Sequence, residues 1–163
     1  MASKDRMVKI EILRSTETIR YAAEELEKYI TMVDSNAKTN IVEAFGEIKL
    51  GLFADFGIDS SEINDPIIDD VIDVKIDGLQ GYIAGSNDRS VLFGVYKYLK
   101  SAGCRWVRPG DDGEHIPQKD LSTHSFTYRK KADYPFRGQA IEGAVSFEHV
   151  RDTILWLPKK EAE

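Results

Sequence analysis

Residues 81–103 read GYIAGSNDRSVLFGVYKYLKSAG, and this stretch decides the fold. Gly81–Ala84 is a short apolar strand, and Asn87 or Asp88 then offers the polar side chain that caps a helix. The spacing predicts a helix over about Arg89–Ala102 that ends at Gly103, with a buried stripe of Val91, Leu92, Val95, Leu99 and Ala102. A strand that leads directly into an amphipathic helix is a unit of layered domains that contain both elements.

The segments before this unit supply more of a sheet. Val71–Ile76 and Gly81–Ala84 flank the turn Asp77-Gly78-Leu79-Gln80, which predicts an antiparallel hairpin. Alternating apolar residues predict strands over Met7–Leu13 and Glu47–Ala54. An amphipathic helix, Thr16–Val33, lies between them, so these two strands are expected to pair in parallel.

The remaining segments complete the predicted domain. Asp34–Thr39 is interpreted as a polar turn, Cys104–Val107 as a short strand and Leu121–Tyr128 as a further strand. The predicted fold class is α+β: a mixed β-sheet with two main helices packed on one face. This domain spans residues 7–130.

A different unit follows it. Phe136–Ile141 is strand-like, and Ser146 caps a helix that carries Val150, Ile154 and Leu157. One strand and one helix cannot cover their own apolar faces. Residues 134–163 therefore either begin a second domain or pack back onto the first.

Composition excludes several function classes. The 163 residues carry a formal net charge of −6, which disfavours nucleic acid as a partner. No apolar run approaches the length of a membrane span. The N-terminal residues lack the apolar core of a signal peptide, which favours the cytoplasm.

The usual catalytic and cofactor motifs are missing from the sequence. His115, His124 and His149 lie in separate segments without a His-Glu-x-x-His pattern, so no metal site is predicted, although a metallohydrolase stays an alternative. Cys104 follows a helix C-terminus and is interpreted as a buried structural thiol. Because no dinucleotide or phosphate-binding glycine motif occurs either, no cofactor is expected.

An acidic stretch runs from Asp55 to Asp77. It holds eight carboxylates and a single basic residue, Lys75. A calcium site is one interpretation, but the spacing of an EF-hand loop is missing. The favoured interpretation is a solvated acidic loop that runs into a strand.

Arg137 and Glu142 are the candidate binding residues. Arg137 lies in Tyr134-Pro135-Phe136-Arg137-Gly138, where a planar guanidinium could donate to two sugar hydroxyls. Glu142 lies just beyond the strand-like segment, at the edge where barrel enzymes place their active sites. The alternative for Arg137 is a surface ion pair.

Three stretches together resemble a known family. They are IRYAAEEL (19–26), IAGSNDRSVLFGVYKYL (83–99) and GCRWVRPG (103–110). They are similar to the N-terminal accessory domain of glycoside hydrolases of the β-N-acetylhexosaminidase (family 20) and α-glucuronidase (family 67) kind. The resemblance covers about residues 8–142.

The resemblance implies a non-catalytic domain in front of a TIM barrel. The segment 134–142, YPFRGQAIE, looks like the first barrel strand of the hexosaminidases, in which the arginine binds substrate hydroxyls. Glu142 stands where that family often has Asp. The acid–base pair of the family lies on a later strand, so residues 1–163 are expected to lack glycosidase activity, and the expected partners are a carbohydrate and the rest of the barrel.

A second function class stays open. The chain could be a stand-alone carbohydrate-binding or protein-interaction module that stacks sugars on Tyr82, Tyr96, Tyr98 or Trp106. Tyr98 and Trp106 fall in core-like positions, so burial is the favoured interpretation for these two rings.

Overall fold

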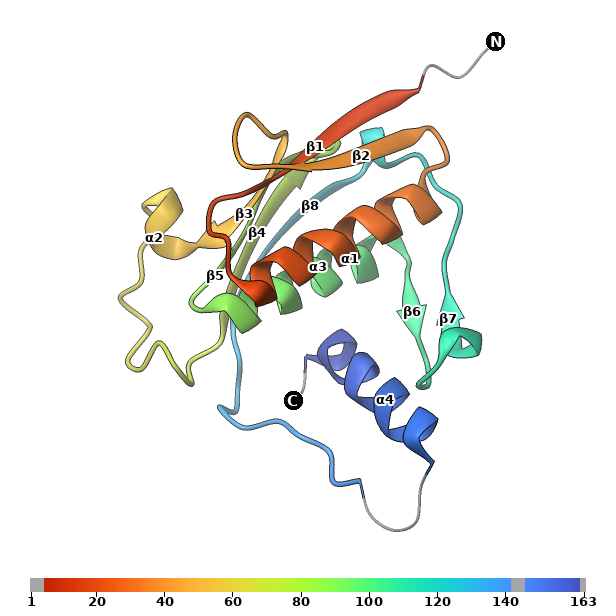
Figure 1. Ribbon diagram of the computed structural model, residues 1–163. Coiled ribbons are helices and arrows are strands. Elements are labelled where there is room, and N and C mark those ends of the chain that lie inside the picture. The colour runs from red at the N-terminus through yellow and green to blue at the C-terminus, as the bar shows by residue number, and fades with distance from the viewer. Residues whose placement is uncertain (1–4, 142–145, 162–163) are drawn as a thin grey trace.

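The computed structural model describes residues 5–141 and 146–161, and its centre is one six-stranded mixed sheet (Figure 1). The strand order is β2-β1-β3-β5-β4-β8. Neighbours among β2, β1, β3 and β5 pair in parallel, whereas β4 pairs antiparallel with β5 and with β8. The strands are β1 (Arg6–Ile12), β2 (Ala37–Val42), β3 (Ile48–Leu52), β4 (Val71–Asp77), β5 (Gln80–Gly85) and β8 (Ser125–Lys131).

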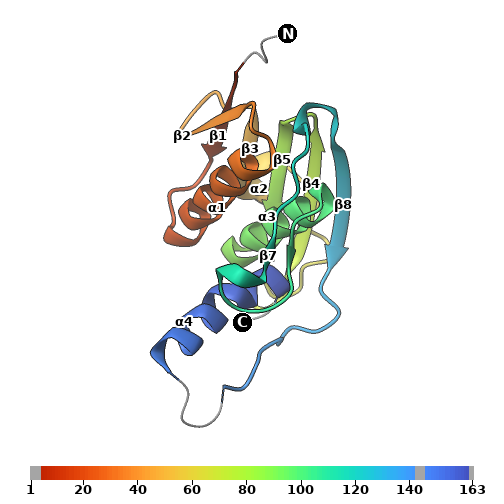
Figure 2. The ribbon, with the colours of Figure 1, turned by 90° about the vertical axis from the view of Figure 1, so that its right-hand side faces the viewer.

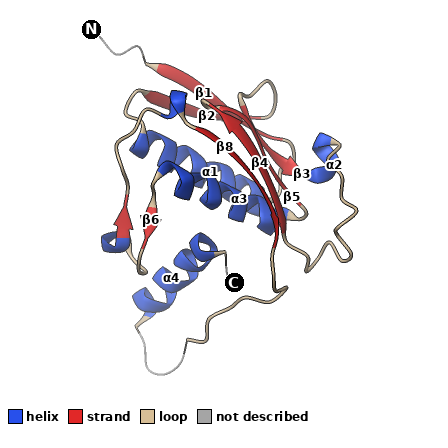
Figure 3. Ribbon diagram, turned by 180° about the vertical axis from the view of Figure 1, so that it is seen from behind, coloured by secondary structure: helices blue, strands red, loops and turns tan. Residues whose placement is uncertain are grey.

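Two helices, α1 (Glu17–Val33) and α3 (Asp88–Ala102), cover one face of this sheet (Figure 3). Their apolar stripes and the inward side chains of the strands form one core. A short helix, α2 (Phe53–Phe56), contributes to a small second cluster with Val71 and Ala84, which point to the other face of their strands. The α+β prediction, with a mixed sheet and two main helices on one face, is confirmed.

The predicted caps of α3 are confirmed, and α1 is capped as well. The Asn87 side chain accepts a hydrogen bond from Ser90 N, and Thr16 Oγ1 accepts one from Ile19 N at the start of α1. Gly103 ends α3 with φ 111°, a left-handed conformation that favours glycine. These contacts are local in sequence, which is why the residue pattern alone predicts them.

The polar turn predicted over Asp34–Thr39 reaches only to Asn36, and the prediction is wrong beyond it, because β2 begins at Ala37. The parallel pairing of β1 with β3 is confirmed, but the crossover through α1 leads first to β2, on the other side of β1. As an edge strand, β2 is only partly buried and carries Lys38, Thr39 and Asn40. It therefore lacks the alternation that marks a half-buried strand.

Two smaller predictions need correction. The strand after α3 is limited to β6 (Arg105–Trp106), which pairs with β7 (Glu114–His115). Leu121–Thr123 forms a 3-10 turn before β8, because the Asp120 side chain accepts a hydrogen bond from Ser122 N and starts that turn.

The C-terminal segment packs back onto the domain (Figure 2). The predicted strand over Phe136–Ile141 is not formed, because no neighbouring strand pairs with it in the part of the chain that the structure describes. The predicted helix is confirmed as α4 (Phe147–Trp156), with Ser146 as its cap, and a 3-10 turn (Leu157–Lys160) follows. We call residues 132–161 the tail.

Candidate functional site

The candidate site lies where β5 ends and α3 begins. β5 runs parallel to β3 and β8 runs antiparallel to β4, so β3, β5 and β8 all end at the same edge of the sheet. The loop that precedes β4 and the start of the tail reach this edge too. In open sheets, the crevice outside the carboxyl ends of parallel strands is where ligands bind.

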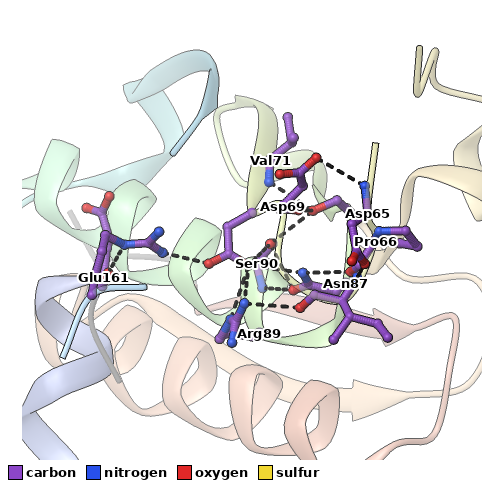
Figure 4. Close-up of polar contacts among 12 residues, drawn as sticks. Asp65, Pro66, Asp69, Val71, Asn87, Arg89, Ser90 and Glu161 are labelled. Carbon is purple, nitrogen blue, oxygen red and sulfur yellow. Dashed lines mark hydrogen bonds and ion pairs between the residues drawn. The ribbon is translucent and has the colours of Figure 1, made fainter. Parts of the chain in front are cut away.

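Asp70 is the buried centre of this edge, with an exposed fraction of 2%. Its Oδ1 accepts hydrogen bonds from Asn87 Nδ2 (3.0 Å) and Ser90 Oγ (3.1 Å), both at the start of α3. Oδ1 also accepts from Arg89 Nε (3.1 Å) and Nη2 (3.0 Å). Figure 4 shows Asn87, Arg89 and Ser90 gathered at this point.

The second Asp70 oxygen binds the tail. Arg137 Nη2 lies 2.6 Å from Asp70 Oδ2, and the side chain of Arg137 is 22% exposed. Burial raises the pKa of Asp70, but hydrogen bonds from Asn87, Arg137 and Arg89 outweigh it, and the pKa lies below its ordinary value. One ionised carboxylate therefore connects α3, the preceding loop and the tail.

Arg137 thus lies at this edge of the sheet, in a segment that forms no strand. Its Nε donates to Glu161 O (2.8 Å) and its Nη1 donates to Tyr134 O. Its guanidinium also lies 5.6 Å from the centre of the Phe93 ring. These bonds leave one N–H group on each terminal nitrogen for another acceptor. Glu142, the other candidate residue, lies outside the described residues.

A cavity of about 180 Å³ opens beside Arg137. Phe93 and Tyr128 give it apolar walls, and Lys97, Lys130, Lys160 and Glu161 supply charged groups. Glu161 Oε1 lies 2.6 Å from Lys97 Nζ and 3.1 Å from Lys100 Nζ, so the tail forms part of the cavity wall. The volume is below that of a site for a drug-sized ligand.

Two cations of β8 pair with carboxylates of the acidic stretch 55–77. Arg129 on β8 contacts Glu62 and Asp73 at 2.6 and 2.7 Å. Lys131 lies 2.8 Å from Asp69, and hydrogen bonds from Lys131 and two backbone N–H groups lower the pKa of Asp69 to about 2. Among residues 5–141 and 146–161, no three His, Cys, Asp or Glu side chains are placed to hold a metal ion.

The other sequence candidates fall outside this edge. Cys104 is fully buried, and burial raises the pKa of its thiol to about 11, so the interpretation as a structural residue is confirmed. Tyr98 and Trp106 are buried, as expected, and so is Tyr96; Tyr82 is half-buried. In the described part of the chain, no helix is long and apolar enough to cross a membrane.

Asp70 and the tail contacts were not predicted from sequence. Asp70 is one of eight similar carboxylates in its stretch, and nothing local distinguishes it. The tail is further anchored by Trp156 Nε1, which donates to Trp106 O (3.0 Å), and by Lys159 Nζ, which lies 2.9 Å from Glu114 Oε1. The sequence predicts only that the tail could pack back onto the first domain, and not which residues it contacts.

Acid is expected to release the tail. Burial raises the pKa values of Asp70, Glu114 and Glu161, but their hydrogen bonds and cations outweigh it and leave each pKa lowered. Docking is therefore complete above the ordinary values of 3.8 and 4.5 and is lost as pH falls through the lowered ones. Hydrogen exchange at pH 7 and at about pH 3, corrected for intrinsic rates, should show lost protection in 147–157 before 19–30. Parallel loss in both segments would contradict this order.

Comparison with known proteins shows a similarity in fold to one class of enzyme. No family model and no curated protein matches the chain. Among solved structures, it is similar to a family 115 4-O-methyl-α-glucuronidase with specificity for decorated arabinogalactans. The TM-score is 0.58 at 18% identity, over 83% of this chain and 19% of the other, so the chain spans about a fifth of that enzyme's length. The domain thus has the fold of part of a glycoside hydrolase of family 115, and the resemblance to families 20 and 67 stays a prediction.

Proposed function

We propose that this chain is the non-catalytic N-terminal domain of a carbohydrate-active glycoside hydrolase and that it supports the catalytic barrel. Two findings support the proposal: the similarity in fold to part of such an enzyme, and the motifs in 19–26, 83–99 and 103–110. In this proposal the domain boundary falls between residues 130 and 134.

The exposed apolar side chains carry the proposal. Five of the ten large hydrophobic residues that are exposed in the described chain fall within 134–155: Tyr134, Phe136, Phe147, Ile154 and Leu155. In α4, Phe147, Ile154 and Leu155 share one stripe, while Thr153 and, in the turn after the helix, Leu157 are buried. A helix that packs on the domain with one side and exposes an apolar stripe on the other suits a position between two bodies.

The proposal assigns Arg137 and Glu142 to the sugar pocket of the longer enzyme. For Arg137, the remaining N–H groups on both terminal nitrogens could each donate to a sugar hydroxyl while the bond to Asp70 is kept. For Glu142, the proposal rests on the resemblance alone. The stand-alone binding module is less well supported, because Tyr96, Tyr98 and Trp106 are buried.

The test places aspartate on the exposed stripe of the longer protein. Phe147→Asp should separate the unfolding of the two domains and lower the melting temperature of the barrel, because it puts a charge into a buried contact. Phe45→Asp is the matched control, since Phe45 is 90% exposed and lies outside the tail. The isolated chain should not hydrolyse aryl glycosides. Equal effects of the two substitutions, or a reading frame that ends at Glu163, would contradict the proposal.

A further inference from the structure

Two aromatic residues and one glutamate, from three separate segments, form a cluster. Tyr29 comes from α1, Trp106 from β6 and Glu114 from β7. The rings of Tyr29 and Trp106 meet edge to face at 5.1 Å and 82°. Tyr29 Oη donates to Glu114 Oε1 (2.5 Å), and Trp106 Nε1 lies 3.1 Å from both Tyr29 Oη and Glu114 Oε1. We call these three residues the cage, and all of its internal bonds are made without the tail.

The tail places an ammonium group in the cage. Lys159 Nζ lies 2.9 Å from Glu114 Oε1 and 3.0 Å from Tyr29 Oη. The same nitrogen lies 5.5 Å from the centre of the Tyr29 ring and 5.6 Å from that of Trp106. The side chains of Lys159 and Glu114 are both only 11% exposed. The ammonium group thus lies at the hydroxyl end of the Tyr29 ring, where a carboxylate and a phenolic oxygen accept its hydrogen bonds.

The approach to the cage favours a cation. A cavity of about 100 Å³ borders Trp106, Glu114 and Lys159. Four carboxylates line it, from Glu25, Asp111, Glu114 and Asp152, against two cations other than Lys159, from Lys28 and Arg108. Without Lys159, the lining therefore carries two net negative charges, which would draw a small cation toward the cage.

We propose that Tyr29, Trp106 and Glu114 form a binding site for a primary ammonium group, and that Lys159 is its tethered ligand. The cage holds the end of the tail as a receptor holds a ligand, so a free primary amine can take the place of the lysine once that side chain is removed. This inference does not depend on the proposed function, because every residue in it belongs to the described chain.

The test fills a vacated cage with a small amine. Lys159→Ala removes the side chain beyond Cβ, and n-propylammonium restores the missing atoms carbon for carbon. The core of the first domain does not include Lys159, so the variant should fold. Titration of Lys159→Ala with n-propylammonium chloride should shift the indole N–H resonance of Trp106 to saturation. It should also raise the melting temperature by about 2–4 °C at high occupancy, as for any ligand of the native state.

Three controls separate a specific site from a solvent effect. The wild type should not respond, because its cage is occupied. Lys159→Met should not respond either, because a neutral side chain of similar length fills the space. In the double variant Lys159→Ala, Glu114→Gln, the affinity for n-propylammonium should be at least about tenfold weaker, since a charged hydrogen bond is lost.

Several results would overturn the inference. Lys159→Ala could respond equally to 1-propanol and to n-propylammonium, or it could fail to respond to the amine. The wild type could also respond to the amine as strongly as Lys159→Ala does. Hydrogen exchange in 147–157 that is identical in wild type and Lys159→Ala would also count against it, because the lysine would then not hold the tail.

Discussion

Replacement of Asp70 by alanine is expected to lower the free energy of unfolding by about 3 kcal/mol. The carboxylate is buried and receives hydrogen bonds from Asn87, Arg89, Ser90 and Arg137. Without it, the guanidinium groups of Arg89 and Arg137 lose the buried carboxylate that both of them bind. Because Arg89 and Arg137 keep 30% and 22% side-chain exposure, water compensates in part, and the loss stays at the lower end for a broken buried pair.

Denaturant unfolding of wild type and Asp70→Ala would measure this loss. Asp133→Ala is the matched control, because Asp133 is exposed, contacts Lys130 on the surface and should change stability by less than about 0.5 kcal/mol. Asp70→Asn keeps the shape but not the charge, so it should fall between the two. If Asp70→Ala matched Asp133→Ala, the network around Asp70 would contribute no net stability. Hydrogen exchange should further show a loosened tail in Asp70→Ala.

Gly85→Ala is the second large expected effect, with a loss of about 3 kcal/mol or more. A Cβ at residue 85 would lie 2.5 Å from Val91 N and 2.7 Å from Asn87 O, both in the backbone of the first turn of α3. Backbone atoms at this distance cannot move aside as a flexible side chain can. The helix would shift away from the end of β5 and weaken the cap that Asn87 forms with Ser90 N.

Gly57→Ala is the comparison for this variant. Residue 57 has φ 63°, and no atom lies within 4 Å of the added carbon. It should therefore show only the conformational cost of a left-handed alanine, about 1 kcal/mol. Melting curves of the two variants separate steric conflict from backbone strain. Equal losses would mean that α3 adjusts its position freely at the carboxyl end of β5.

Features that depend on residues close together in the chain can be predicted from the sequence. The caps Thr16, Asn87 and Gly103 each act within a few residues, and the hairpin around Gly78 depends on local turn geometry. The edge strand β2 was missed, because a strand with one partner does not need a regular apolar face.

The candidate site could be predicted only in part. Asn87, Arg89 and Ser90 belong to the motif in residues 83–99. Their shared partner Asp70 comes from a stretch of eight carboxylates that no local pattern distinguishes. The aromatic and glycine neighbours of Arg137 make it a candidate, but its place beside Asp70 depends on a contact between residues 67 positions apart. Such contacts are set by the packing of the whole fold, and no local pattern encodes them.

The place of β1 inside the sheet makes the molecule mechanically asymmetric. A force applied through residue 161 would first pull on Arg137, Trp156 and Lys159 one contact after another, then reach β8 at the edge of the sheet. A force applied through residue 5 would act at once on β1, which is hydrogen-bonded to β2 on one side and β3 on the other. A motor that unfolds proteins by threading would therefore peel the chain from its C-terminal side at low force and stall longer at its N-terminal strand.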